Sequence, residues 1–581
     1  MISADAQFLS LRITAVFFKE KGFEVGAWIW TFWVKDNKNF KNMRSINGTE
    51  IKEFMCPKDE NFVKFAADYI KDIAKIGVDI IQFDDDFRYG FLSDSPACLC
   101  DNHIAEINRI TGENSTREEL AKHIVSGGKN KYRDAYLKAN GDAFRNFAAE
   151  IRKAVDEVNP NIRIGACSCM TSWDIDGTNA AELAKILAGN TQPFVRLIGA
   201  PYWAMFNAWG NSLQDFVELE RMESSWTRKD NIEIFAEGDA WPRPRTRCPA
   251  NYLEGFDTAI RASGCTDGIL KYGIDYLSNA DYETGYAKFH ERNRGTYAKI
   301  DEMFGDKTCC GVRVYESMNK LSDMVVPTAV NSKVSIEYLF FSKAARTLAF
   351  NTIPTVYEGK GVCGIVFDEN ARILPLDAIK NGLIIDIAAA EILDARGIDV
   401  GIESFGAVLI SGESEHFTDN DNHILTDGLP IYDIKLKPNA EVLSDTKTSA
   451  GVIPMSYRYK NSDGNRFLVL NVNTRSDNSN VLKHYARSRQ YAENIPWLSG
   501  KKLPAYVYGN PALYIMCKKN EKSIAVGLWN FFADIAIDPV VELDAEYSGI
   551  EFINTNGKLD KNKVYLNDIP PFGFVGFEVK I

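Results

Sequence analysis

The chain has 581 residues, which is too long for one domain, so two to four domains are expected. A net charge of −12 and a pI near 5.3 argue against nucleic acid and anionic membranes as partners. The longest apolar runs are too short to span a bilayer, and the chain does not open on a signal-peptide pattern. Eleven Cys residues form no paired framework, which favours a reducing compartment, so we expect a cytoplasmic protein.

Strands and helices alternate through the first half of the chain, after a helix-like stretch over residues 8–21. The expected strands are 23–32, 78–83, 162–169, 194–198, 231–236 and 268–274, and the expected helices are 62–76, 131–158, 181–187, 213–225, 252–263 and 283–303. This alternation predicts an α/β fold with parallel strands and helical crossovers, as in a (β/α)8 TIM-type barrel. Six strands precede Met303, so the first two βα units of such a barrel are missing from the pattern. A truncated chain and an incomplete barrel are both open explanations.

The pattern changes after residue 307. Strands at 312–315, 353–357 and 382–386 with helices at 334–351 and 387–396 predict a small α/β domain over residues 308–420. From 421 to 581, short strands with turn-rich joints predict a β-sandwich. We therefore expect a barrel domain (1–307), a small α/β domain (308–420) and a β-rich C-terminal domain (421–581).

The most informative segment is Ile80–Phe87, with the sequence IIQFDDDF. A run that is apolar on both faces is typical of a buried parallel strand, and three adjacent carboxylates cannot lie inside one because buried unpaired charge is costly. Asp84, Asp85 and Asp86 are therefore expected at the C-terminal tip of the strand, where α/β barrels place their chemistry. A solvated acidic turn or a calcium loop is the alternative, which the apolar lead-in and the absent oxygen spacing disfavour.

A second carboxylate ends a later strand. If the first visible strand is the third of a barrel, the triplet ends the fourth and Glu237 ends the seventh, roughly across the barrel mouth. Two carboxyl groups about 5 to 5.5 Å apart suit retaining glycoside hydrolysis. Aromatic side chains, which suit the apolar faces of sugar rings, follow the same strands: Trp28, Trp30, Trp33, Tyr202, Trp203, Trp209 and Trp241. Core packing is the alternative for each Trp taken singly.

The segment IIQFDDDF resembles the fourth-strand motif of glycoside hydrolase family 42, a β-galactosidase family of clan A, whose strand has the pattern W-Q-x-D-N-E-Y. The resemblance implies that Asp86 is the acid/base and Glu237 the nucleophile. The chain departs from the motif, because Asp replaces Glu at position 86 and Asp replaces Asn at position 85. The shorter side chain moves the carboxyl group by about one carbon–carbon bond, so Asp84 or Asp85 could serve instead or tune the pKa of the acid. The chain is thus similar to a divergent member of this family.

The resemblance extends to a metal site. Cys56-Pro57 together with Cys98-Leu-Cys100-Asp-Asn-His103 is similar to the structural zinc cluster of many family 42 enzymes, with His103 in place of the last Cys. Buried free thiols are the alternative. No organic cofactor is expected. In the family, the domain that corresponds to 308–420 is flavodoxin- or amidotransferase-like and often forms the subunit interface, which implies a homo-oligomer, a dimer or trimer.

The resulting hypothesis is a retaining, exo-acting β-glycosidase that binds a carbohydrate, most similar to β-galactosidases. The expected substrate-binding residues are Arg88, Trp28, Trp30, Trp203 and Trp241, and Arg88 could also offset part of the charge of the triplet. Two other functions remain open: an α-glycosidase with Asp84 or Asp85 as nucleophile, and a non-catalytic carbohydrate-binding or assembly protein.

Overall fold

The computed structural model describes residues 4–35, 39–90, 95–205, 212–228, 231–241, 245, 248–273, 285–326, 341–426, 428–474, 480–509 and 513–581. The chain divides into two compact units. The first comprises Met1–Ile198, Trp226–Ala236 and Met318–Phe340, and the second comprises Gly199–Ser225, Glu237–Ser317 and Phe341–Ile581. None of the helices in these described ranges is long and apolar enough to cross a membrane.

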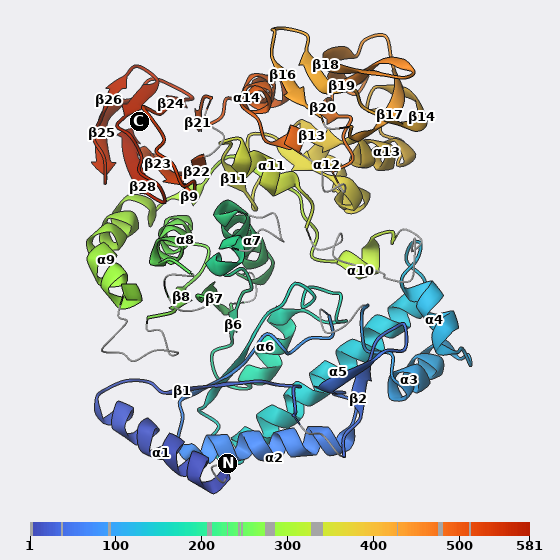
Figure 1. The fold of residues 1–581 in the computed structure, drawn as a ribbon, viewed down its shortest axis with the longest axis vertical. Helices are drawn as coiled ribbons and strands as arrows, with labels where there is room; N and C mark the ends of the chain where they lie inside the picture. Colours follow the sequence, from blue (N-terminus) through green and yellow to red (C-terminus); the bar gives the residue numbers. More distant parts are fainter. Residues whose placement is uncertain are drawn as a thin grey trace. The chain divides into compact units, whose positions relative to one another are not determined.

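A parallel sheet begins in the first unit, where Figure 1 shows its strands β1 (Gly26–Ile29) and β6 (Phe194–Arg196). Its strands pair in parallel in the order β1, β4 (Ile80–Phe83), β5 (Arg163–Cys167), β6 and β7 (Glu233–Gly238). β8 (Gly268–Lys271), which belongs to the second unit, is the sixth strand of the same sheet, so the six strands of the predicted alternation are confirmed. An antiparallel hairpin of β2 (Asn42–Arg44) and β3 (Glu50–Met55) was not predicted.

The helices of the first unit are α1 (Ala4–Glu20), α2 (Glu60–Ile76), α3 (Asp101–Thr111), α4 (Arg117–Ile124), α5 (Lys131–Asp156), α6 (Ala180–Ala188) and α10 (Lys320–Asp323). Helix α2 begins where the Asp59 side chain accepts a hydrogen bond from the Asn61 N–H and ends at Gly77, whose φ of 94° suits a glycine cap. Its buried side chains join Ile81 and Phe83 of β4 in one hydrophobic core. One face of the sheet is therefore covered by helices, and alternate residues of β4 point to the other face.

The second unit contains helices α7 (Leu213–Thr227), α8 (Ala250–Ser263), α9 (Gly285–Phe304), α11 (Ala344–Phe350), α12 (Leu376–Ile379), α13 (Ile387–Ala395) and α14 (Tyr485–Ser499). Its largest sheet has the order β11 (Thr355–Val356), β10 (Val312–Val314), β12 (Gly364–Val366), β13 (Leu383–Asp386), β20 (Arg466–Leu470), β19 (Gly451–Lys460), β18 (Glu441–Thr448), β15 (Ser414–Phe417) and β16 (His423–Leu425). A separate antiparallel pair joins β14 (Ile402–Ile410) to β17 (Pro430–Leu436). The predicted helix over 334–351 is described only from 341 onward.

The predicted boundary after residue 420 falls inside this largest sheet. The reason is that β20 pairs in parallel with β13 while β19, β18, β15 and β16 continue the sheet by antiparallel pairing. β20, which falls within the segment expected to form a C-terminal sandwich, thus belongs to the α/β sheet. The division into three domains stays a prediction.

The C-terminal segment is rich in strands, as predicted. One sheet has the order β21 (Ala505–Val507), β24 (Val540–Leu543), β27 (Lys563–Leu566) and β26 (Gly557–Asp560), and the other has the order β25 (Ser548–Ile553), β28 (Phe574–Lys580), β23 (Ser523–Asn530), β22 (Leu513–Lys519) and β9 (Thr308–Cys309). Side chains from both sheets, such as Val541 and Phe577, share one hydrophobic core. The two sheets therefore form a sandwich around that core.

Candidate functional site

The face of the first unit's sheet that is not covered by helices carries polar side chains. Parallel partners in register point to the same face, and Gln82 is in register with Gly165 while Cys167 is in register with Arg196. The Gln82 side-chain amide donates to the Cys167 sulfur at 3.0 Å. This face therefore presents a row of polar groups from β4, β5 and β6.

Asp84 continues that row. Its N–H donates to the Ile29 carbonyl at 2.9 Å, so the ladder to β1 extends one residue beyond β4 and alternation places Asp84 on the same face as Gln82. Its Oδ1 accepts from the Asp85 N–H at 2.8 Å and lies 3.7 Å from the Arg196 guanidinium, and the side chain is 14% exposed. Burial, and then the charge of Asp85, raise the pKa of Asp84 to about 6, although Arg196 acts to lower it.

This pKa predicts a pH-dependent stability change in Asp84→Asn. Asp84 keeps its proton up to about pH 6 in the folded state but only up to about pH 3.8 in the unfolded state. The free energy of unfolding therefore falls as the pH rises between these two values. Above pH 6 the ionised Asp84 then costs up to about 3 kcal/mol, since one pKa unit corresponds to about 1.4 kcal/mol. Asn cannot ionise, so Asp84→Asn should raise Tm at pH 7.5 but not at pH 3.5, as measured by differential scanning fluorimetry.

The matched control is the exposed Asp463→Asn, which should leave Tm unchanged at both pH values. An equal rise of Tm at pH 3.5 and pH 7.5 in Asp84→Asn would contradict the assigned pKa shift.

Asp86 has a different environment. Both of its oxygens accept from the Thr31 N–H at 2.8 Å, and Oδ2 also accepts from the N–H groups of Phe32 at 2.8 Å and Trp33 at 3.2 Å. The side chain is only 8% exposed. Burial raises the pKa of Asp86, and the backbone hydrogen bonds act in the opposite direction. These bonds also explain why β1 ends at Ile29 and not near residue 32 as predicted, because the following N–H groups bond to Asp86 and not to a strand.

Asp85 completes the triplet. Its Oδ2 lies 3.1 Å from the Arg88 guanidinium, so Arg88 does offset charge in the triplet. The same guanidinium lies 3.5 Å from the Cys169 sulfur. The three neighbouring carboxylates therefore differ: Asp85 has the shorter ion pair, Asp86 accepts several backbone N–H groups at both oxygens, and the contacts of Asp84 with the Asp85 N–H and with Arg196 are both at Oδ1.

Two of the predicted aromatic side chains of the first unit are exposed, which excludes core packing for them. Trp28 is 58% exposed and Trp30 is 53% exposed. Trp28 is in register with Gln82, on the face that leads to Asp84. Trp30 packs edge-to-face on Trp33 with ring centroids 4.5 Å apart, and the Trp33 indole N–H donates to Glu53 at 3.0 Å. These side chains form an aromatic surface beside the triplet.

Glu237 lies in the second unit, at the end of β7. It is buried, its Oε2 accepts from the Gly199 N–H at 3.2 Å, and its own N–H donates to Glu220 at 3.0 Å. Gly199 has a φ of 152°, and a Cβ there would lie 3.2 Å from the Glu220 side chain. Trp241 is also exposed, whereas Trp203 is half-buried and packs edge-to-face on Phe216 at 5.6 Å.

The structure thus groups Asp84, Asp85, Asp86, Arg88, Trp28 and Trp30 in the first unit, and Glu237, Trp203 and Trp241 in the second. The predicted Trp209 lies outside the described residues. Sequence analysis missed Arg196, Glu220 and Gly199 as neighbours of the carboxylates. Arg196 carried a signal, because it is the single charge within the apolar strand 194–198.

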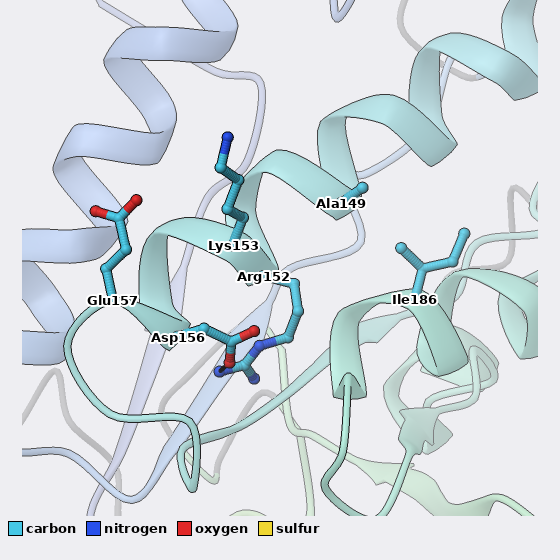
Figure 2. Close-up of a pocket in the computed structure, with 6 residues that line it drawn as sticks. All are labelled: Ala149, Arg152, Lys153, Asp156, Glu157 and Ile186. Carbon is cyan, nitrogen blue, oxygen red and sulfur yellow. Dashed lines mark ion pairs between the residues drawn. The ribbon is translucent and has the colours of Figure 1, made fainter.

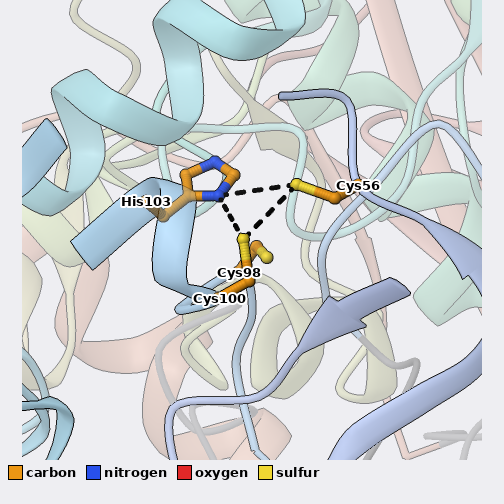
Figure 3. A group of neighbouring side chains, drawn as sticks. All are labelled: Cys56, Cys98, Cys100 and His103. Carbon is orange, nitrogen blue, oxygen red and sulfur yellow. Dashed lines mark hydrogen bonds between the residues drawn. The ribbon is translucent and has the colours of Figure 1, made fainter. Parts of the chain in front are cut away.

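The predicted metal ligands lie together in the first unit (Figure 3). The Cys56 sulfur is 3.6 Å from the Cys100 sulfur and 3.6 Å from His103 Nδ1, and Cys100 is 3.3 Å from His103 Nδ1. All four ligand atoms, including that of Cys98, lie within 4.8 Å of one another and all four residues are buried. Tetrahedral bonds of about 2.0 to 2.3 Å require ligand separations of roughly this size. The cluster could therefore hold a metal ion.

The surroundings of the cluster support this arrangement. Cys56 follows β3 directly, Cys100 caps the N-terminus of α3 and His103 lies in its first turn. Hydrogen bonds from Cys56 and Cys98 lower the pKa of Cys100, which favours its thiolate. His103 Nε2 lies 3.4 Å from the Tyr89 hydroxyl, which orients the ring so that Nδ1 faces the sulfurs.

Two hollows lie on the helical layer of the first unit, and neither is lined by the acidic triplet. One of about 550 Å³ lies between α5 and α6, where Arg152 and Asp156 form a 2.7 Å ion pair (Figure 2). The other, of about 1040 Å³, is lined by α2, α3 and α5 with side chains of both charges. Neither includes a predicted site residue, so neither is assigned to the candidate site.

A buried ionic network in the second unit was not predicted. The Lys271 ammonium lies 2.5 Å from Glu254 and 2.6 Å from Asp257, and contacts the Tyr297 hydroxyl at 2.9 Å and His290 at 3.1 Å. These residues come from β8, α8 and α9. Arg261 of α8 also pairs with Asp257, so two cations match the two carboxylates and the paired charges join the three elements.

Comparison with known proteins gives a fold but no close relative. No protein-family model and no curated protein matches the sequence. Among solved structures, the chain is similar to a β-galactosidase from Rahnella sp. R3 (TM-score 0.61, 11% identity, 99% of this chain and 91% of that one). It is also similar to a catalytic mutant of Gan42B, a GH42 β-galactosidase from G. stearothermophilus (TM-score 0.60, 10% identity, 99% and 91%). A third is a β-galactosidase from Bacillus circulans sp. alkalophilus (TM-score 0.57, 11% identity, 99% and 97%).

These comparisons confirm the predicted resemblance to family 42 at the level of the fold. With identities near 10%, they do not transfer a substrate or a mechanism.

Proposed function

We propose that this protein is a retaining, exo-acting glycoside hydrolase that cleaves β-galactosides or related β-glycosides. The observation that carries the proposal is the pair of carboxylate positions at the tips of β4 and β7, in a fold that the chain shares with β-galactosidases. The exposed Trp28 and Trp30 beside the triplet support a carbohydrate ligand, because aromatic faces suit sugar rings.

The proposed mechanism is a double displacement. Glu237 is the proposed nucleophile, and the acid/base comes from the triplet, where Asp86 occupies the position implied by the family motif and Asp84 and Asp85 are the alternatives. The mechanism requires the two carboxyl groups to flank one glycosidic bond about 5 to 5.5 Å apart. The N–H of Gly199 donates to Oε2 of Glu237 and so helps to hold this carboxyl group in place.

The test is turnover on a panel of aryl α- and β-glycosides, with the anomer of the first-formed product identified by NMR. We expect activity on a β-glycoside and release of the β-anomer. An exclusive α-preference would favour the α-glycosidase hypothesis, and an inert chain that still binds sugar would favour a binding protein.

We also propose that Cys56, Cys98, Cys100 and His103 hold one structural zinc ion. Three sulfurs and one imidazole form a closed set typical of structural zinc, and the four buried ligand atoms fit it. Zinc bound there would stabilise the loop before α3 and the end of β3, and it supplies no step of the hydrolysis.

A cytoplasmic homo-oligomer, a dimer or trimer, is the proposed state of the protein. Size-exclusion chromatography with light scattering tests the oligomeric state, and a monomer at all concentrations would contradict it.

A further inference from the structure

We propose that Asp84 is the proton donor of this site and that Asp86 is a positioning residue for the aromatic loop of Trp30 and Trp33. The inference rests on the proposed glycoside hydrolase function. The family motif implies that Asp86 is the acid/base, whereas this inference gives that role to Asp84.

Both oxygens of Asp86 accept backbone hydrogen bonds, which does not suit a proton donor. An acid must carry a proton on an oxygen that faces the leaving group at about 2.6 to 3.2 Å. Both oxygens of Asp86 instead accept hydrogen bonds from the N–H groups of Thr31, Phe32 and Trp33. A proton on either oxygen would compete with these donors, so protonation would weaken the loop that the carboxylate holds.

Asp85 is also engaged, because it lies 3.1 Å from the guanidinium of Arg88. Asp84 differs from both. Oδ1 of Asp84 accepts the hydrogen bond from the Asp85 N–H and is also the oxygen that lies 3.7 Å from Arg196. Oδ2 accepts no hydrogen bond from the residues that the structure describes. Strand alternation places it on the polar face, with Gln82 and the exposed Trp28. Asp84 therefore has an oxygen available and points to the face where the sugar is proposed to bind.

Both half-reactions of the proposed double displacement conserve atoms and electrons. In the first half, an oxygen of the nucleophilic carboxylate bonds to the anomeric carbon, the glycosidic C–O bond breaks, and its electron pair stays on the leaving oxygen, which takes the proton of Asp84. In the second half, the Asp84 carboxylate takes a proton from water as the water oxygen bonds to the anomeric carbon. The ester C–O bond breaks as the water oxygen bonds, and the nucleophile regains its carboxylate, so the net change is addition of one water molecule across the glycosidic bond.

The role of Asp86 follows from the residues it binds. Asp86 accepts hydrogen bonds from the N–H groups of Thr31 and Phe32, which follow Trp30 directly. It also accepts one from Trp33, whose ring packs on Trp30. Losing these bonds should release the aromatic surface that is proposed to hold the sugar. Asp86 variants should therefore weaken substrate binding more than they slow proton transfer.

The test compares Asp84→Ala and Asp86→Asn on 2,4-dinitrophenyl and phenyl β-D-galactopyranoside, with and without sodium azide. We expect Asp84→Ala to lower kcat/KM on the phenyl glycoside by about 10²- to 10⁴-fold, the range of general acid catalysis, and far less on the dinitrophenyl glycoside, whose departure needs little proton help. Azide should restore turnover in this variant and yield the β-galactosyl azide. Asp86→Asn should raise KM on both substrates alike, with no azide product.

Trp30→Ala provides a second measurement if Asp86→Asn folds poorly. It should reproduce the rise of KM that is common to both substrates, because it removes the surface that Asp86 positions. A leaving-group-dependent loss with azide rescue in Asp86→Asn, and not in Asp84→Ala, would overturn this inference while leaving the glycosidase function intact. A wild-type protein that is inert on both glycosides and on the wider panel would instead overturn the proposed function, and this assignment with it.

Discussion

Replacing Glu237 with Ala should lower turnover of the preferred β-glycoside by several orders of magnitude, because it removes the only group that can form the covalent glycosyl intermediate in the proposed mechanism. Glu237 is buried at the end of β7, and the backbone pairing of β7 with β6 does not involve its side chain, so its replacement should leave the strand intact. Steady-state kinetics on the wild type and the variant measure the loss. Added azide should restore turnover and give the glycosyl azide of inverted configuration, since azide would attack from the face that the carboxylate had occupied.

A matched control lies on the same strand. Glu233 begins β7 and pairs with Arg163, so Glu233→Ala removes the same side chain from the opposite end of the strand. It should retain most of the activity.

Covalent labelling tests the same assignment independently. A 2-fluoro glycoside of the correct sugar should leave a mass increment on the peptide that contains Glu237. A label on Asp84 or Asp85 would contradict the assignment and support the α-glycosidase hypothesis.

Removing the metal should destabilise the first unit. In closed four-ligand sites the binding free energy is largely folding free energy, about 10 to 16 kcal/mol for isolated zinc-binding peptides. Cys98→Ser should therefore cost at least about 3 kcal/mol, a fall in Tm of roughly 6 to 12 °C for a unit of this size. Calorimetry measures Tm, and elemental analysis of protein kept away from chelators should find one zinc per chain.

The control for this variant is Cys363→Ser, which changes a buried thiol of the second unit outside the cluster. It should leave the zinc content unchanged. Because the cluster has no role in the proposed chemistry, the folded fraction of Cys98→Ser should keep its intrinsic kcat. Wild-type protein without zinc, or an equal loss of Tm in both variants, would contradict the metal site.

Several features follow from the sequence alone because they depend on short-range patterns. The strand at 80–83 and its polar tip follow from an apolar run that ends in charges, since such charges cannot be buried within a sheet. The grouping of Cys98, Cys100 and His103 follows from their close spacing, which resembles that of a zinc cluster. Alternation of strands and helices likewise predicted the parallel sheet, because each crossover needs a helix between parallel strands.

Other features were decided only by tertiary structure, because they depend on segments far apart in the chain. The carboxylates of the triplet have different surroundings because of distant segments. The backbone N–H groups of residues 31–33, some fifty residues earlier in the chain, donate to Asp86, and Arg196 of β6 lies near Asp84. Likewise β20 joins β13 across about eighty residues, a parallel pairing that local strand patterns do not specify. Adjacent Asp residues have the same intrinsic chemistry, so their differences in hydrogen bonding and pKa come from the groups that the fold places around each one.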